Sequence, residues 1–193
     1  YKRQDLGDGV TCFEFHSKMN TIDPSILWTL NQSINMMSNS NGKYRAMVIY
    51  NEAKNFSLGA NLGLIQAGFN AARNPFFKAT GISKLIENRT YGLVEDLVYQ
   101  GQSIFKAMQQ APFPVVGAPN GMALGGGCEV LLHCDAIQAG AETYMGLVES
   151  GVGVIPGWGG CARYLERRQA ASETKGGPMP GVKDTFLALA MPQ

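Results

Sequence analysis

Glycine is concentrated between Gly117 and Gly160, and this segment most limits how the chain can fold. The 193 residues include 24 glycines, against an ordinary share of about 7%. Because the segment is otherwise varied in sequence, its glycines indicate positions where the backbone approaches another group or takes a positive φ. The triplet Gly125-Gly-Gly127, followed by a short apolar run, predicts a tight turn into a helix whose first N–H groups lack partners within the helix.

Two glutamates lie within this glycine-rich backbone. Glu129 falls in the first turn of the predicted helix, where the helix dipole favours an ionised carboxylate, and Glu149 falls on a later loop. Singly, Glu129 could cap its own turn and Glu149 could be an exposed turn residue. Together they favour a site, because neither lies in a charged surface stretch. The pattern Gly125-x-Gly127-x-x-Val130 lacks the third glycine of a dinucleotide-binding fingerprint, and the sequence contains no P-loop or nucleophile elbow.

Composition excludes several classes of function. The net charge of +1 gives no electrostatic case for binding nucleic acid or an anionic membrane. No apolar run approaches the length of a membrane span, and the charges at Lys2, Arg3, Asp5 and Asp8 argue against a signal peptide. Since the four cysteines have no CxxC spacing, we expect neither disulfides nor a metal site, and a reducing, cytoplasmic location.

Strand-like and helix-like segments alternate, which predicts a single α/β domain with crossover connections. Asp23 and Pro24 predict a helix start, as cap and first helical residue. The predicted strands are Val10–Phe15, Ala46–Tyr50, Pro114–Gly117 and Ala136–Ala139. The predicted helices are Ser25–Met37, one beginning near Leu62, Glu87–Gln110 with an irregularity around Gly101, Gly126–His133, one after Gly160, and Val182–Met191, the last preceded by a Gly/Pro-rich linker over residues 172–181.

A second turn of small residues, Asn55-Phe-Ser-Leu-Gly-Ala60, lies far upstream of the glycine triplet. It is either a tight connection from strand to helix or the source of a second backbone donor for an oxyanion. Oxyanion holes are built from donors that converge on one oxygen. The two histidines, His16 and His133, have no partner in the sequence that suggests a triad or a metal site, and we expect packing or surface roles for them.

These motifs resemble the crotonase, or enoyl-CoA hydratase/isomerase, superfamily. The resemblance covers roughly Leu6 to Leu165 in order and spacing, through Phe56-Ser-Leu-Gly-Ala-Asn-Leu62, Ala123-Leu-Gly-Gly-Gly-Cys-Glu129, Met145-Gly-Leu-Val-Glu149 and Ile155-Pro-Gly-x-Gly-Gly160. It implies an α/β crotonase (ClpP-like) ββα-superhelix fold, with a core domain over residues 1–169. Residues 170–193 would then be a linker and the start of a C-terminal helical region that is truncated relative to the family.

The resemblance also implies roles for individual residues. The N–H groups of Ala60 and Gly126 would bind a thioester carbonyl, and Glu129 and Glu149 would hold the water that adds to 2-trans-enoyl-CoA. Coenzyme A contacts are implied for Lys18, Ser57, Ala60, Asn61 and Leu62. Asn61 stands where the family more often has aspartate, and we expect little effect of this change because the hole uses the backbone of Ala60.

Within the family, the particular residues of these motifs resemble those of a subgroup in which the domain is fused behind a 3-hydroxyacyl-CoA dehydrogenase of fatty-acid β-oxidation. That implies no cofactor in this domain, NAD only in the fused dehydrogenase, acyl-CoA or enoyl-CoA as ligand, and a homo-oligomer or the fused domain as partner. Two alternatives stay open. One is an enoyl-CoA isomerase, and the other is a non-catalytic piece that binds coenzyme A or assembles a larger enzyme.

Overall fold

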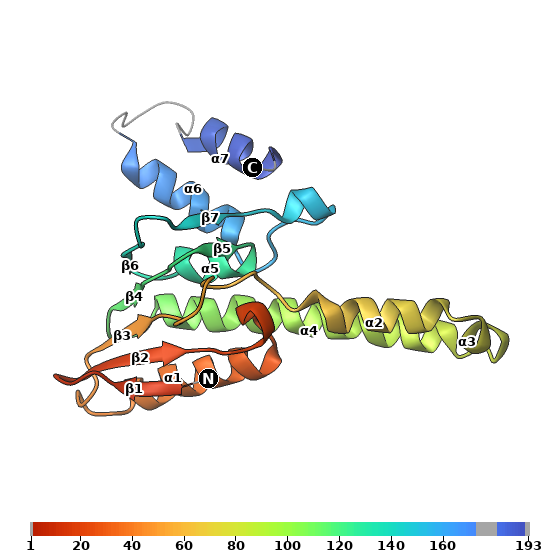
Figure 1. Ribbon diagram of the computed structural model, residues 1–193, viewed down its shortest axis with the longest axis horizontal. Coiled ribbons are helices and arrows are strands. Elements are labelled where there is room, and N and C mark those ends of the chain that lie inside the picture. The colour runs from red at the N-terminus through yellow and green to blue at the C-terminus, as the bar shows by residue number, and fades with distance from the viewer. Residues whose placement is uncertain (1, 173–180, 192–193) are drawn as a thin grey trace.

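The computed structural model describes residues 2–172 and 181–191. Its main sheet has five strands in the order β1-β2-β3-β4-β6 (Figure 1). The pair β1–β2 is antiparallel, and the pairs β2–β3, β3–β4 and β4–β6 are parallel, as crossover connections require. The strands are β1 (Lys2–Asp5), β2 (Val10–Glu14), β3 (Ala46–Ile49), β4 (Val115–Gly117) and β6 (Ala136–Ile137). Four of them confirm predicted strands, and β1 was not predicted.

The first helix, α1 (Pro24–Ser38), begins where the sequence predicts. The side chain of Asp23 accepts hydrogen bonds from the N–H groups of Ser25 (2.9 Å) and Ile26 (3.0 Å), and Pro24 takes the first helical position. A cap of this kind satisfies donors that the helix itself leaves unpaired. One face of α1 is apolar and buried against the sheet, and it consists of Ile26, Leu27, Leu30, Ile34 and Met37.

The main core lies between this face of α1, one face of the sheet and the last turns of α4 (Ser83–Gln109). Phe13 of β2 and Phe15, which follows the strand, both lie in this core with their ring centres 6.2 Å apart, and both are 1% exposed. Ile104, Phe105 and Met108 close the core from α4. Leu93, in the first half of α4, is 62% exposed, because this part of the helix lies beyond the sheet (Figure 1).

The first half of α4 runs beside α2 (Leu62–Arg73), and the pair projects from the body with α3 (Pro75–Ala79) at its tip (Figure 1). The predicted irregularity at Gly101 is wrong, since α4 is continuous there. A Cβ at Gly101 would lie 2.2 Å from Nε1 of Trp158. Glycine at this position therefore makes room for a neighbouring ring and does not break the helix.

A second, two-stranded parallel sheet carries the glycine-rich segment, and the sequence did not predict it. It consists of β5 (Met122–Leu124) and β7 (Tyr144–Gly146). Beside it lie α5 (Gly126–Leu132), α6 (Gly160–Ala171) and α7 (Gly181–Ala190), and two short 3-10 turns, η1 (Lys18–Asn20) and η2 (Glu149–Val152), flank the site described below. Residues 173–180 of the predicted linker lie outside the described residues, and the predicted domain boundary at residue 169 stays a prediction.

Candidate active site

Two backbone segments that are far apart in sequence meet at the start of α5. Gly125 takes φ +52° and ψ −122°, a conformation that only glycine adopts readily, and turns β5 into the helix. A Cβ at Gly59 would lie 3.1 Å from the N atom of Gly126, and a Cβ at Gly126 would lie 3.3 Å from the N atom of Ala60. The sequence requires glycine here because the backbone around Gly59 approaches that around Gly126.

The N–H groups of Ala60 and Gly126 are both free to bind a ligand. Gly126 is the first residue of α5, so its N–H has no acceptor within the helix. Ala60 forms an isolated bridge with Ile22 in which the neighbouring groups, Gly59 O and Asn61 N, make the hydrogen bonds at 2.8 and 2.9 Å. Among the described residues, neither N–H finds a protein acceptor. Ala60 is half-buried, so this donor pair borders accessible space.

Glu129 projects from the first turn of α5 into the interior and is 2% exposed. Its Oε1 accepts two backbone hydrogen bonds, from the N–H of Trp158 (2.8 Å) and from the N–H of Gly160 (2.8 Å). Gly160 begins α6, so a helix N-terminus faces the carboxylate. Because Oε1 is occupied twice, Oε2 is the oxygen left to exchange a proton.

Glu149 begins η2 and is half-buried. A Cβ at Gly125 would lie 3.1 Å from its Oε1, which places the carboxylate against the residue just before the donor Gly126. Its Oε2 is buried and has no hydrogen-bond partner among the described residues. A buried carboxylate oxygen without a partner is costly unless it receives a ligand, and it can accept a hydrogen bond from water or substrate.

Burial raises the pKa of both candidate carboxyl groups. Burial, together with the negative charge of Glu149, raises the pKa of Glu129 from 4.5 to about 7, although the hydrogen bonds from the N–H groups of Gly160 and Trp158 act to lower it. Burial therefore opposes the helix dipole, which favours the ionised form, and has the larger effect on this carboxyl group. Burial also raises the pKa of Glu149. Two carboxyl groups that repel one another titrate as a coupled pair.

Trp158 connects the carboxylate to the long helix α4. Its backbone N–H binds Glu129, and its indole N–H donates to the carbonyl of Leu97 (3.1 Å). Gln102 of α4 donates to the neighbouring carbonyl of Gly157 (2.7 Å). The turn that holds Glu129 is thus fixed to α4 at two points, and the indole ring packs edge-on against Phe105 at 5.5 Å between ring centres.

The residues predicted to contact coenzyme A occupy different settings. Lys18 is exposed on η1, Leu62 is 53% exposed at the start of α2, and Asn61 caps α2 through a hydrogen bond from the N–H of Gly63 at 3.2 Å. Ser57 is fully buried, and its hydroxyl is bonded inside the fold. The coenzyme A contacts of these residues and of Ala60 stay predictions. Because the side chain of Ser57 is buried, it is not accessible to coenzyme A.

The sequence interpretation missed the groups that hold Glu129. The donors of Trp158 and Gly160 are backbone atoms without a side-chain signature, although the turn Pro156-Gly-Trp-Gly-Gly160 was a visible signal of close backbone approach.

His133 packs as expected: its Nδ1 lies 2.8 Å from the carbonyl of Glu129, and burial lowers the pKa of its ring. Within residues 2–172 and 181–191, no group of three His, Cys, Asp or Glu side chains could hold a metal ion, and no helix could cross a membrane.

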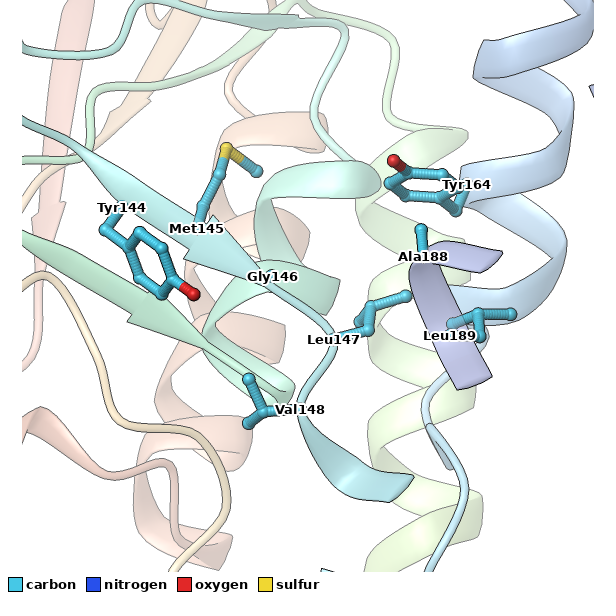
Figure 2. Close-up of a pocket in the computed structure, with 8 residues that line it drawn as sticks. All are labelled: Tyr144, Met145, Gly146, Leu147, Val148, Tyr164, Ala188 and Leu189. Carbon is cyan, nitrogen blue, oxygen red and sulfur yellow. The ribbon is translucent and has the colours of Figure 1, made fainter. Parts of the chain in front are cut away.

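A small hollow lies between β7, α6 and α7 (Figure 2). It is lined by Tyr144, Met145, Gly146, Leu147, Val148, Tyr164, Ala188 and Leu189. Its volume of about 50 Å³ is far below the roughly 300 Å³ and more of ligand pockets. We therefore regard the hollow as a packing gap under α7.

Comparison with known families agrees with this geometry. The family model described as enoyl-CoA hydratase/isomerase matches residues 76–175, which is just over half of the chain. The chain belongs to the enoyl-CoA hydratase/isomerase family. The matched range includes α5, Glu129, Glu149 and the turn that holds Glu129. The resemblance found in the sequence motifs is confirmed, and the chain is a crotonase domain like those of enoyl-CoA hydratases.

Among curated family members, a protein of Bacillus subtilis named "Probable 3-hydroxyacyl-CoA dehydrogenase" is 35% identical over 188 residues, which cover 97% of this chain and 21% of that protein. A short-chain-enoyl-CoA hydratase of Clostridium acetobutylicum is 35% identical over 98 residues, covering 48% of this chain and 35% of that enzyme. The crystal structure of an enoyl-CoA hydratase from Bacillus anthracis superposes with a TM-score of 0.75 and 22% sequence identity. The match covers 100% of this chain and 62% of the chain of that enzyme. This last likeness confirms the crotonase fold. The chain spans only about a fifth to a third of the two curated relatives.

Proposed function

We propose that this chain catalyses the addition of water to a 2-trans-enoyl-CoA, giving a 3-hydroxyacyl-CoA. The observation that carries the proposal is the meeting of two free N–H groups, of Ala60 and Gly126, with two carboxyl groups of raised pKa, of Glu129 and Glu149. Hydration of a double bond conjugated to a thioester needs both a place for negative charge on the carbonyl oxygen and groups that move protons to and from water.

In the proposed reaction, the thioester oxygen accepts hydrogen bonds from Ala60 and Gly126. One carboxylate takes a proton from water as the water oxygen bonds to C3, and the electrons of the double bond move toward the thioester oxygen. The other carboxyl group supports delivery of a proton to C2, which restores the thioester. Loss of one such N–H donor typically costs about 10²–10³ in rate, and loss of one acid or base about 10²–10⁴.

The chain's place in a larger enzyme is part of the same proposal. The relative named as a 3-hydroxyacyl-CoA dehydrogenase is several times longer than this chain, and 3-hydroxyacyl-CoA is the product of the hydration. We infer that the domain works next to such a dehydrogenase, that NAD is used there, and that no cofactor is needed at Glu129 and Glu149.

Product analysis tests this function. The full-length protein is incubated separately with crotonyl-CoA and with a 3-enoyl-CoA, and the products are identified by mass spectrometry. We expect crotonyl-CoA to gain one water. Conversion of the 3-enoyl-CoA to its 2-enoyl isomer without hydration would indicate an isomerase instead. Binding of acyl-CoA in a calorimetric titration without turnover of either compound would indicate a non-catalytic domain.

A further inference from the structure

Ser57 is a buried residue of the segment that carries the N–H of Ala60, and it contacts the segment that carries the N–H of Gly126. Its side chain is 0% exposed, and its Oγ donates to the carbonyl of Asn20 (2.7 Å) and accepts from the N–H of Gly59 (3.2 Å). Gly59 immediately precedes the donor Ala60. The hydroxyl therefore fixes the peptide next to the one whose N–H faces the ligand.

The backbone of Ser57 is joined in the same way to the other segment. Its N–H donates to the carbonyl of Met122 (3.0 Å), and its carbonyl accepts from the N–H of Leu124 (2.9 Å) on β5, two residues before Gly126. A Cβ at Gly127 would lie 2.7 Å from both the Cβ and the carbonyl oxygen of Ser57. Ser57 is thus packed directly against the first turn of α5.

The third element at Ser57 is η1, where Met19 and Asn20 take φ of +58° and +51°, which is rare for residues other than glycine. This conformation brings the carbonyl of Asn20 to Ser57, and the side-chain amide of Asn20 donates to the carbonyl of Asn55 (3.1 Å). Strained backbone of this kind persists where the surroundings determine it and often lies at functional sites.

We propose that Ser57 is a positioning residue of the oxyanion hole: its hydroxyl ties η1 to Gly59 and so aims the N–H of Ala60 at the oxygen that Gly126 also faces. This inference rests on the proposed function. Because the side chain is buried and all its hydrogen bonds go to the backbone, Ser57 acts on the orientation of a donor and not on coenzyme A itself. A misplacement of about 1 Å in such a group can cost roughly 10²-fold in rate.

The test compares Ser57→Ala with Ser33→Ala in the full-length protein. Ser33 is the matched control: it is 1% exposed on α1 and its hydroxyl donates to the carbonyl of Thr29 at 2.8 Å, outside the site. We expect Ser57→Ala to lower kcat by roughly 10-fold to 100-fold with KM nearly unchanged, and Ser33→Ala to leave both constants unchanged. Ser57→Cys, whose thiol is a weaker donor and acceptor, should fall between and serves if Ser57→Ala does not fold.

A second readout does not depend on turnover. Hydrogen bonds to a thioester carbonyl lower its stretching frequency, which isotope-edited infrared spectroscopy can measure with bound butyryl-CoA. We expect the lowered frequency in the wild type and in Ser33→Ala, and a return toward the free value in Ser57→Ala. Unchanged kcat and frequency in Ser57→Ala would overturn the inference, as would a raised KM with unchanged kcat, which indicates a contact with coenzyme A.

The two measurements separate the inference from the proposed function. If the wild-type protein lowers the carbonyl frequency but forms no 3-hydroxyacyl-CoA, the proposed hydration is contradicted. The role of Ser57 is then tested by comparing the carbonyl frequency in Ser57→Ala with that in the wild type. A wild-type protein that binds no acyl-CoA would contradict both.

Discussion

The Oε1 atom of Glu129 and the backbone N atom of Gly160 lie 2.8 Å apart, and this hydrogen bond joins the first turn of α5 to the first residue of α6. A Cβ at Gly160 would lie 2.9 Å from both Cγ and Oε1 of Glu129. The carboxylate is therefore held by a helix start that can approach it only because residue 160 has no side chain.

Substitution of Gly160 should displace this carboxylate. We expect Gly160→Ala to lower kcat for crotonyl-CoA by at least about 10-fold, because positioning of an acid or base is part of its contribution, and to destabilise the fold by about 1–3 kcal/mol through overpacking. Steady-state kinetics and urea unfolding measure the two effects. Wild-type kcat in a folded Gly160→Ala protein would show that the position of Glu129 does not matter.

Two glycines of α4 offer a matched pair for stability. A Cβ at Gly101 would lie 2.2 Å from the Trp158 ring, whereas a Cβ at Gly92 would meet nothing within 4 Å. We expect Gly101→Ala to lower the free energy of unfolding by about 1–3 kcal/mol and Gly92→Ala to raise it by about 0.5–1 kcal/mol. Chemical denaturation of both variants checks the difference, and equal effects would mean that Trp158 does not pack on α4 as described.

The raised pKa of Glu129 predicts a dependence of stability on pH. Since burial raises its pKa in the folded state from 4.5 to about 7, its contribution is fully present below about pH 4.5 and is lost as the pH rises through about 7. Glutamine does not titrate, so the Glu129→Gln protein should not lose this stability. Its free energy of unfolding, relative to that of the wild type, should therefore rise by up to about 3 kcal/mol between pH 4.5 and pH 8. Urea unfolding at both pH values tests this, and parallel curves for the two proteins would contradict a raised pKa.

Asn61 shows how far a departure from the family pattern matters. It caps α2 with its side-chain oxygen, which an aspartate can also do. We expect Asn61→Asp to raise stability by about 0.3–1 kcal/mol, because a negative charge favours a helix N-terminus, and to leave kcat within about twofold, because the N–H of Ala60 is unchanged. A large loss of kcat would mean that the charge at residue 61 acts on the substrate.

Local signals in the sequence predicted much of the fold. Asp23 and Pro24 located the start of α1, and the glycine triplet located the start of α5 together with Glu129. The second sheet was not predicted, because its strands pair Met122 with Tyr144 across the intervening α5 and β6, and such a pairing leaves no local signal in the sequence.

The sequence indicated the side chains of the candidate site but not the backbone groups that bind them. Glu129 and Glu149 are visible in the sequence, whereas the N–H groups of Trp158 and Gly160 that bind Glu129 are backbone atoms that only the folded turn brings together. The raised pKa of Glu129 was not predicted for the same reason, since its burial is set by distant segments of the chain.

The kcat of Glu129→Gln with crotonyl-CoA, measured in the full-length protein, tests whether the carboxyl group of Glu129 takes part in the hydration. The amide oxygen can keep the hydrogen bonds from Trp158 and Gly160, so the fold should be retained, and Glu142→Gln at an exposed position serves as control. We expect a kcat about 10²–10⁴-fold below wild type, with the control unchanged. Turnover of Glu129→Gln at the wild-type rate would contradict this expectation.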